Sequence, residues 1–193
     1  DSHEVVVYTT DVKDFCSRLE KISNNIIDGI RVYRFRNLSM KLVKNLKLFI
    51  TPEMISIVNR KLKEFDVVHL HEYRTFQNII INYYAKNHDV PYVLQAHGSL
   101  LRIESKQELK YIYDVFFGRK LLREASLVIA LTKAEANQYK SMKVSEKKIV
   151  IVPNGIDLSE YTVLPPKGVF KKKYNIPEDK KIILYLGRIH RIK

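Results

Sequence analysis

Cysteine is almost missing from the sequence: Cys16 is the only one, so no disulfide bond can form within the chain. A single cysteine without Cys pairs also argues against a structural zinc site, which draws its four ligands mainly from Cys and His. Proteins kept in a reducing compartment use cysteine this sparsely, so we expect a cytoplasmic protein. We interpret Cys16 as a small half-buried residue and not as a nucleophile.

Long apolar runs are missing as well, since no segment approaches the roughly 18 apolar residues of a membrane-spanning helix. The sequence also opens without a signal-peptide pattern and without an initiator methionine. Residues 4–10 already have the pattern of a buried strand, so we expect the chain to begin inside a longer protein.

Acidic residues are the minority charge: 21 Asp and Glu stand against 34 Lys and Arg, for a net charge of +13. More than half of this excess lies in residues 167–193, which contain nine basic and two acidic residues. A basic balance suits nucleic acid, an anionic membrane surface or an acidic small substrate. Its concentration near the end of the sequence favours a local phosphate-binding role. We expect no nucleic-acid partner, because aromatic residues interleaved with base-reading side chains are not evident.

Short apolar runs alternate with segments of helical periodicity, which predicts an α/β fold with a Rossmann-like parallel sheet and helices on both faces. Strands are expected over residues 4–9, 30–34, 66–71, 91–96, 127–131 and 148–152. Helices are expected over residues 12–25, 51–64, 75–87, 105–124 and 133–141. Thr132 and Glu135 form a predicted capping box, in which the Thr side chain bonds forward and the Glu side chain reaches back.

Residues 152–157 are interpreted as a hinge at the end of this first unit. A linker, a short basic helix over 167–174 and a buried strand over 182–186 are expected to follow. The domains are therefore predicted to be residues 1–163, which hold the sheet, and residues 164–193, which open a second domain.

The segment 36–50 has two interpretations. Its apolar residues share one helical face and its lysines another, the pattern of a basic helix lying on a membrane. The same pattern suits an ordinary surface helix that caps the sheet, and this second interpretation is favoured. The apolar face contains Leu42, Val43, Leu46, Phe49 and Ile50, and the basic face contains Lys41, Lys44 and Lys47.

Polar residues follow the ends of four predicted strands. In open parallel sheets, ligands bind beyond the carboxyl ends of the strands, so these residues are expected to line one rim. The predicted substrate-binding positions on this rim are His71, Gly98, Ser99, Thr132, Asn154 and Gly155.

His97 is the strongest catalytic candidate on this rim. Gly98 beside it lets backbone amides approach a ligand, and an imidazole at this position can bond a sugar hydroxyl or an acceptor group. The alternative is that His97 simply ends a strand. For His71 the functional and structural interpretations stay open, whereas His69 is expected to point to the opposite face and to pack there.

Gly187 and Arg188, with Lys193 five residues further on, form a second group. Arg188 offers a planar, permanently charged fork for two phosphate oxygens, and Lys193 adds a mobile point charge. Such a pair is able to neutralise a leaving diphosphate without a metal ion. The alternative is a solvated basic tail, but its place directly after a predicted buried strand favours phosphate binding.

Together these segments resemble the retaining, nucleotide-sugar-dependent family 4 glycosyltransferases of the GT-B fold. The matching segments are residues 66–71, 95–99, 130–132, 151–157 and 186–188. The resemblance implies an acceptor-side domain followed by the start of a donor-side domain. It places His97 beside the donor sugar and the acceptor, and Arg188 and Lys193 on the donor diphosphate.

The implied reaction moves a hexose from a nucleoside diphosphate sugar to a hydroxyl acceptor, with retained configuration and without metal or cofactor. The expected partners are the nucleotide-sugar donor and a carbohydrate or lipid-linked acceptor. The resemblance implies carbohydrate biosynthesis in the cytoplasm, with or without peripheral contact to the inner face of the membrane.

The sequence also departs from the family. The family's first strand, which lies mid-sheet, and its Gly-rich loop are not found, so ladder edges are expected on the strands at either side. Its paired glutamates are not found either, and Glu135 and Glu146 do not replace them. We therefore expect this chain alone not to transfer sugar. Two alternatives remain: a non-catalytic binder of polyanions or anionic membranes, and another GT-B enzyme such as a sugar-phosphate epimerase or synthase.

Overall fold

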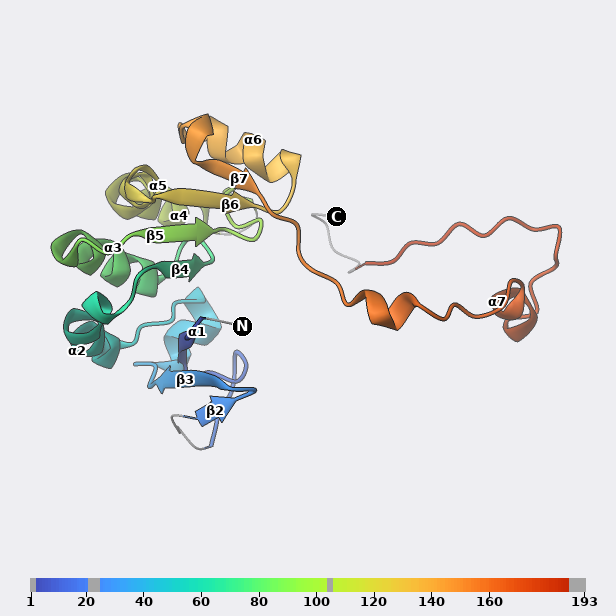
Figure 1. Ribbon diagram of the computed structural model, residues 1–193, viewed down its shortest axis with the longest axis horizontal. Helices are drawn as coiled ribbons and strands as arrows, with labels where there is room; N and C mark the ends of the chain where they lie inside the picture. The colour runs from blue at the N-terminus through green and yellow to red at the C-terminus, as the bar shows by residue number, and fades with distance from the viewer. Residues whose placement is uncertain (1–2, 21–24, 104–105, 188–193) are drawn as a thin grey trace. The chain divides into compact units, whose positions relative to one another are not determined.

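The computed structural model describes residues 3–20, 25–103 and 106–187. It divides into two compact units between Pro153 and Asn154, inside the segment predicted to be a hinge (Figure 1). The assignment of residues 1–163 and 164–193 to an acceptor-side and a donor-side domain stays a prediction. Each unit is described by itself below.

The first unit contains a four-stranded parallel sheet, which confirms the predicted α/β fold. Its strand order is β4-β5-β6-β7, and neighbouring strands run in the same direction (Figure 1). The strands are β4 (Val68–His71), β5 (Tyr92–Gln95), β6 (Leu127–Ala130) and β7 (Ile149–Ile151). All four lie inside predicted strands. The prediction succeeded because short runs rich in Val, Ile and Leu are typical of parallel strands that are covered on both faces.

A second sheet of three strands has the order β1-β3-β2. Its strands are β1 (Val6–Thr10), β2 (Asn25–Ile27) and β3 (Ile30–Phe35), with β1 parallel and β2 antiparallel to β3. Among the described residues, β1 and β4 are edge strands of their sheets, as are β2 and β7. That a missing strand leaves the edges of β1 and β4 open stays a prediction. Both sheets nonetheless contribute to one hydrophobic core, because Phe35 and Leu70 belong to the same buried cluster.

Helices flank the parallel sheet. In the first unit these are α1 (Met40–Leu46), α2 (Pro52–Lys61), α3 (Phe76–His88), α4 (Gln107–Tyr113), α5 (Arg119–Glu124) and α6 (Lys133–Ser141). A π-helical turn, Asp114–Gly118, joins α4 to α5, and 3-10 turns cover Leu62–Glu64 and Glu146–Lys148. Helix α3 packs against α2 and α5, whereas α6 packs on β6 and β7 (Figure 1).

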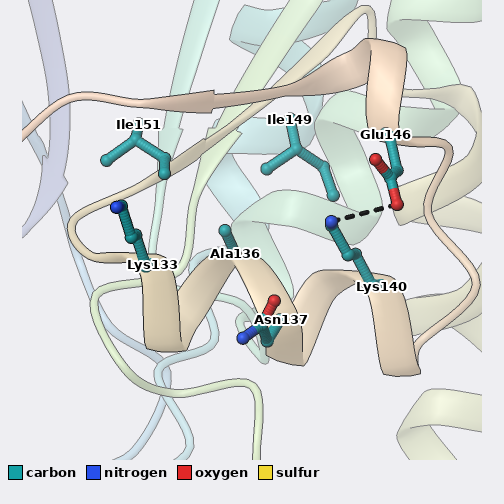
Figure 2. A pocket seen from close by; sticks show the side chains of 7 residues that line it. All are labelled: Lys133, Ala136, Asn137, Lys140, Glu146, Ile149 and Ile151. Atoms are coloured by element: carbon teal, nitrogen blue, oxygen red, sulfur yellow. Dashed lines mark ion pairs between the residues drawn. The ribbon is translucent and has the colours of Figure 1, made fainter.

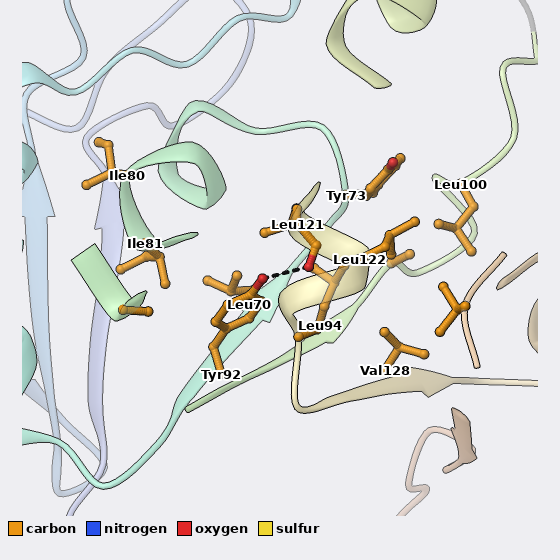
Figure 3. Close-up of a cluster of buried hydrophobic side chains, with 14 of the residues drawn as sticks. Leu70, Tyr73, Ile80, Ile81, Tyr92, Leu94, Leu100, Leu121, Leu122 and Val128 are labelled. Atoms are coloured by element: carbon orange, nitrogen blue, oxygen red, sulfur yellow. Dashed lines mark hydrogen bonds between the residues drawn. The ribbon is translucent and has the colours of Figure 1, made fainter. Parts of the chain in front are cut away.

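The core lies between β4–β6 and helices α3 and α5 (Figure 3). Leu94 and Val128 are fully buried on neighbouring strands, and Leu121 packs over them from α5. The Tyr92 hydroxyl donates a hydrogen bond of 2.6 Å to the Leu121 carbonyl oxygen and accepts one of 3.0 Å from Asn82. A buried phenol therefore fixes α5 on the sheet without leaving its polar atom unpaired.

The helix predicted over residues 12–25 is wrong. Residues 11–20 form turns, and Asn25 begins β2, while residues 21–24 lie outside the described part of the chain. The Asp14 carboxylate accepts backbone hydrogen bonds of 2.8 Å from Cys16 and 2.7 Å from Ser17. Such local bonds offer the backbone an alternative to the helix. The turn also leaves Cys16 exposed, which corrects its predicted half-burial.

The second unit has little regular structure. It contains a 3-10 turn, Leu158–Tyr161, and helix α7 (Val169–Lys173), which lies inside the predicted basic helix. Residues 182–186 are not a strand, and Ile183 is 98% exposed. A buried parallel strand needs neighbours on both sides. None pairs with this segment in the part of the chain that the structure describes.

Helix α1 is an ordinary surface helix, the favoured interpretation of segment 36–50. Val43 is fully buried in the protein, whereas Lys41, Lys44 and Lys47 are exposed. Lys47 ends the helix in the left-handed region, at φ 53°. Among the described residues, no helix combines the length and apolar character that crossing a bilayer requires.

Gly118 lies in the π-helical turn and packs directly on Tyr73. A Cβ atom at residue 118 would lie 2.2 Å from the hydroxyl oxygen and 2.8 Å from Cζ of Tyr73. Tyr73 is 0% exposed, so its ring is unable to move aside without disturbing the core.

Gly118→Ala is expected to lower the free energy of unfolding by about 2 kcal/mol, because an overpacking cost of about 3 kcal/mol exceeds a helix-propensity gain of about 1 kcal/mol. Urea denaturation measures the change. Gly155→Ala is the matched control, since nothing lies within 4 Å of a Cβ there. Its expected effect is below about 0.5 kcal/mol. Equal losses at both positions would contradict the packing explanation.

Candidate functional site

Three histidines meet at the carboxyl ends of β4 and β5. Nδ1 of His71 lies 2.9 Å from Nε2 of His97, with the two rings stacked at a centroid separation of 5.2 Å. The ring of His69 stacks on His71 at 4.2 Å. The prediction that His69 points to the opposite face is therefore wrong: residues two apart on a strand share a face, so His69 and His71 lie side by side.

The environment lowers the pKa of both histidines on strand β4. Burial lowers the pKa of His71 below its usual value, and the neighbouring imidazoles of His69 and His97 lower it further. Burial likewise lowers the pKa of His69. In a hydrogen bond between two imidazoles, one ring nitrogen donates and the other accepts, so the His71–His97 hydrogen bond ties the tautomer of one ring to that of the other.

The backbone around His97 is held in an unusual conformation. His97 has φ 52° and Gly98 has φ 79°, both in the left-handed region. The Gly98 amide donates a 2.6 Å hydrogen bond to Oε1 of Glu135, and the Leu131 amide donates one of 2.7 Å to Oε2. The buried Glu135 carboxylate therefore joins the loop after β5 to the start of α6.

This arrangement corrects the predicted capping box. The Thr132 hydroxyl accepts from the Glu135 amide at 3.2 Å, as expected. The Glu135 side chain does not return to the Thr132 amide but bonds the amides of Leu131 and Gly98. A carboxylate has two oxygens, and here both are used to connect separate segments.

Other predicted rim residues also have structural partners. The Ser99 hydroxyl donates a hydrogen bond of 2.5 Å to the Ala96 carbonyl oxygen and accepts one of 3.0 Å from the Tyr73 amide. Ser99, Thr132 and Gly98 therefore all build the loops around the histidines. Their predicted contacts with substrate stay predictions.

Two of the remaining predicted residues belong to the second unit, and two lie outside the described part of the chain. Asn154 and Gly155 are exposed at the start of the second unit, and their role in substrate binding stays a prediction. Arg188 and Lys193, the predicted diphosphate ligands, lie outside the described residues.

A buried ion pair that the sequence analysis missed supports the same loops. Nε and Nη2 of Arg74 lie 2.9 and 2.8 Å from the two carboxylate oxygens of Asp114. Nη1 and Nη2 of Arg74 also donate to the carbonyl oxygens of Ser99, at 2.5 Å, and Leu100, at 2.8 Å. Arg102 adds a third contact to Asp114, at 3.2 Å. The partners are 40 residues apart, so no local pattern predicts the pair.

The described residues also contain a shallow hollow between α6 and β7 (Figure 2). It is lined by Lys133, Ala136, Asn137, Lys140, Glu146, Ile149 and Ile151. Lys140 and Glu146 form an ion pair of 3.0 Å at its edge (Figure 2). None of the predicted site residues lines this hollow. Within the described chain, no cluster of His, Cys, Asp and Glu is arranged to hold a metal ion.

Comparison with known proteins assigns the chain to a family. Residues 1–160 match Glycosyltransferase Family 4, and the chain belongs to this family. The match covers the parallel sheet and the histidine pair. It favours this family over the alternative of a sugar-phosphate epimerase or synthase of the same fold.

Curated relatives are distant and longer. The UDP-Gal:alpha-D-GlcNAc-diphosphoundecaprenol alpha-1,3-galactosyltransferase of Escherichia coli is 25% identical over 170 residues, which cover 84% of this chain and 41% of the relative. The D-inositol 3-phosphate glycosyltransferase of Kineococcus radiotolerans is 24% identical over 68% of this chain and 31% of the relative. The chain thus spans about two-fifths or less of the length of these relatives.

Solved structures share the fold. HepE from Anabaena in complex with UDP has a TM-score of 0.53 and 16% identity, covering 89% of this chain and 50% of HepE. Its complex with UDP-glucose has a TM-score of 0.50 and 18% identity, covering 76% of this chain and 37% of HepE. These likenesses agree with the Rossmann-like α/β fold of GT-B proteins.

Asp114→Ala is expected to lower the free energy of unfolding by about 3–5 kcal/mol, because it leaves the Arg74 guanidinium buried without its counter-ion. Denaturant titration measures the loss. Glu146→Ala is the control, since Lys140 and Glu146 are 44% and 76% exposed, and breaking this pair costs about 1 kcal/mol or less. Similar losses in both variants would show that the Arg74–Asp114 pair has no special role.

The lowered pKa of His71 predicts a pH-dependent stability. Below about pH 6.5 the unfolded chain binds protons more readily than the native state. The contribution of His71 is therefore complete above about pH 6.5 and is lost as the pH falls toward its lowered native pKa.

His71→Asn keeps a side chain that forms hydrogen bonds but does not titrate. We expect the free energy of unfolding of this variant to depend less on pH than that of the parent between about pH 7 and pH 5. Urea denaturation across this range measures the difference, with His3→Asn as the control for an exposed histidine outside the site. An unchanged or steeper pH dependence in His71→Asn would contradict the assignment.

Proposed function

We propose that the protein containing this chain is a glycosyltransferase that moves a hexose from a nucleoside diphosphate sugar to a hydroxyl acceptor. The observation that carries the proposal is the His71–His97 hydrogen bond at the carboxyl ends of β4 and β5, in a chain of glycosyltransferase family 4. Ligands of open parallel sheets bind at this end of the strands.

His97 is the proposed catalytic residue. Its imidazole is only partly buried, so one ring nitrogen is available to a donor-sugar or acceptor hydroxyl while Nε2 bonds His71. The bond to His71 restrains the orientation of the ring, and the left-handed backbone at His97 and Gly98 sets its direction. A ring held in this way bonds a hydroxyl without first reorganising.

Arg188 and Lys193 are the proposed ligands of the donor diphosphate. Their fixed positive charges would stabilise the negative charge that develops on the leaving nucleoside diphosphate, so the reaction needs neither metal nor cofactor. We also propose that the sugar retains its configuration, as the resemblance implies. The name of the E. coli relative states a UDP-galactose donor and a diphosphoundecaprenol acceptor, which makes UDP-hexoses and lipid-linked sugars the first substrates to test.

We further propose that these 193 residues alone do not complete the reaction. None of residues 154–187 is buried, so the second unit has no core of its own in the described chain. A donor site with preorganised charges requires a packed scaffold. Such a scaffold would have to be supplied by residues other than these 193.

The test uses the product of the complete reading frame, incubated with a panel of UDP-, GDP- and ADP-hexoses and with metal removed by a chelator. Release of nucleoside diphosphate with one donor is expected. His97→Ala is expected to reduce kcat by about 10² or more, since it removes a group that acts in the transition state. His88→Ala, at the end of α3, is the matched control and should stay near parent activity.

Arg188→Ala is expected to reduce donor turnover in the same assay, and analysis of the product's anomeric configuration tests retention. Saturable donor binding with parent-like activity in His97→Ala would remove His97 from the mechanism. Absence of both turnover and saturable donor binding would overturn the transferase proposal. The non-catalytic polyanion or anionic-membrane binder would then be the better account.

A further inference from the structure

Two side chains of helix α6 hold the backbone on either side of His97. Glu135 and Tyr139 are four residues apart, so they project from the same face of the helix, and we name them the α6 pair. The Gly98 amide donates a hydrogen bond of 2.6 Å to Oε1 of Glu135. The Ala96 amide donates one of 3.0 Å to the Tyr139 hydroxyl. The residues before and after His97 are therefore both attached to one helical face.

The α6 pair also binds the end of strand β6. The Leu131 amide donates a hydrogen bond of 2.7 Å to Oε2 of Glu135, and the Tyr139 hydroxyl donates one of 3.2 Å to the Ile129 carbonyl oxygen. In the register of the sheet, Gln95 at the end of β5 lies opposite Ile129. Beyond this point, the side chains of the α6 pair connect the segment that follows β5 to the segment that follows β6.

Both members of the α6 pair are buried. Glu135 is 4% exposed and Tyr139 is 0% exposed. Burial raises the pKa of Tyr139, and the Glu135 carboxylate raises it further, so the phenol keeps its proton near neutral pH. The protonated hydroxyl is able to donate to Ile129 and to accept from Ala96 at the same time. Hydrogen bonds that are shielded from water and fully paired favour one arrangement of the groups that they join.

The turn between these hydrogen bonds needs such support. His97 has φ 52°, and a residue with a side chain rarely adopts the left-handed region. Gly98 follows it at φ 79°, so two successive residues have this conformation. Backbone of this kind persists only where the surrounding structure enforces it. The α6 pair supplies the enforcement, because it fixes the amide directions on both sides of His97.

We propose that Glu135 and Tyr139 are positioning residues for the reaction and that they act by fixing the direction of the His97 imidazole. The inference rests on the proposed function, because it concerns the same catalytic group. Nε2 of His97 lies 2.9 Å from Nδ1 of His71, which leaves Nδ1 of His97 to bond a substrate hydroxyl. A shift of about 1 Å in a reacting group costs on the order of 10²-fold in rate, so small changes in the turn matter.

Two variants remove these hydrogen bonds and keep the shape of the side chains. Glu135→Gln leaves one acceptor oxygen for two amide donors and turns an NH₂ group toward the other donor. Tyr139→Phe loses the hydroxyl alone. In the product of the complete reading frame, each change is expected to lower kcat about tenfold to a hundredfold, while KM for the donor stays within about twofold of the parent value.

Tyr92→Phe is the matched control for a loss of stability. Tyr92 begins β5, is 3% exposed, and its hydroxyl also donates to a backbone carbonyl oxygen, that of Leu121, at 2.6 Å. We expect this variant to lose about as much stability as Tyr139→Phe, with kcat near that of the parent. An equal fall of kcat in both variants would show that kcat follows stability, and it would overturn the proposal.

A combination with His97→Ala tests whether the α6 pair acts through His97. Residues that act as a unit have non-additive effects. Glu135→Gln is therefore expected to lower kcat little or not at all in the His97→Ala background. The same fractional loss in both backgrounds would give Glu135 a role independent of His97, which contradicts the proposal. Circular dichroism checks that the variants fold, and Tyr139→Phe carries the test if Glu135→Gln does not.

A measurement without substrate separates this inference from the proposed function. NMR of protein labelled with nitrogen-15 only at histidine reports the ring nitrogens of His97, whose signals are assigned by their loss in His97→Ala. A single tautomer is expected in the parent, and signals averaged between the two tautomers are expected in Glu135→Gln and Tyr139→Phe. If no donor is turned over, the proposed function fails, but these signals still test the positioning. Unchanged His97 signals in both variants would overturn it.

Discussion

The buried ion pair between Arg74 and Asp114 connects three segments that are distant in the sequence. Arg74 follows β4, its guanidinium bonds the carbonyl oxygens of Ser99 and Leu100 after β5, and Asp114 lies in the π-helical turn. Removing two charges from water costs free energy, and this cost is offset only where each charge has a full set of hydrogen-bond partners. The turn after β4, the loop after β5 and the π-helical turn must therefore adopt their native arrangement together.

The histidine pair depends on this arrangement. His71 ends β4 and His97 follows β5, so their 2.9 Å hydrogen bond requires both strand ends to stay in register. Glu135 supports the same loop from α6 by accepting the Gly98 amide. The site is thus supported from two sides by buried carboxylates, as the catalytic role proposed for His97 would require.

The same ion pair has a consequence on the opposite side of the helix. A short helix that turns Asp114 and the Tyr113 hydroxyl inward has few positions left for burying its apolar residues. Leu109, Ile112 and Phe116 therefore face outward between basic residues.

Local patterns in the sequence determined most of the fold. The strands of the parallel sheet, the helices after β4 and the Thr132 cap were predictable because periodicity and side-chain chemistry within a few residues indicate them. The position of His71 and His97 at one rim followed from the general geometry of parallel sheets. Tertiary structure alone decided the double use of Glu135 and the Arg74–Asp114 pair. The turn at Asp14 and the stacking of His69 on His71 follow instead from local geometry, which the sequence analysis misjudged. Tertiary structure also decided that residues 182–186 are not a strand, because an apolar run becomes a strand only where neighbouring strands pair with its backbone.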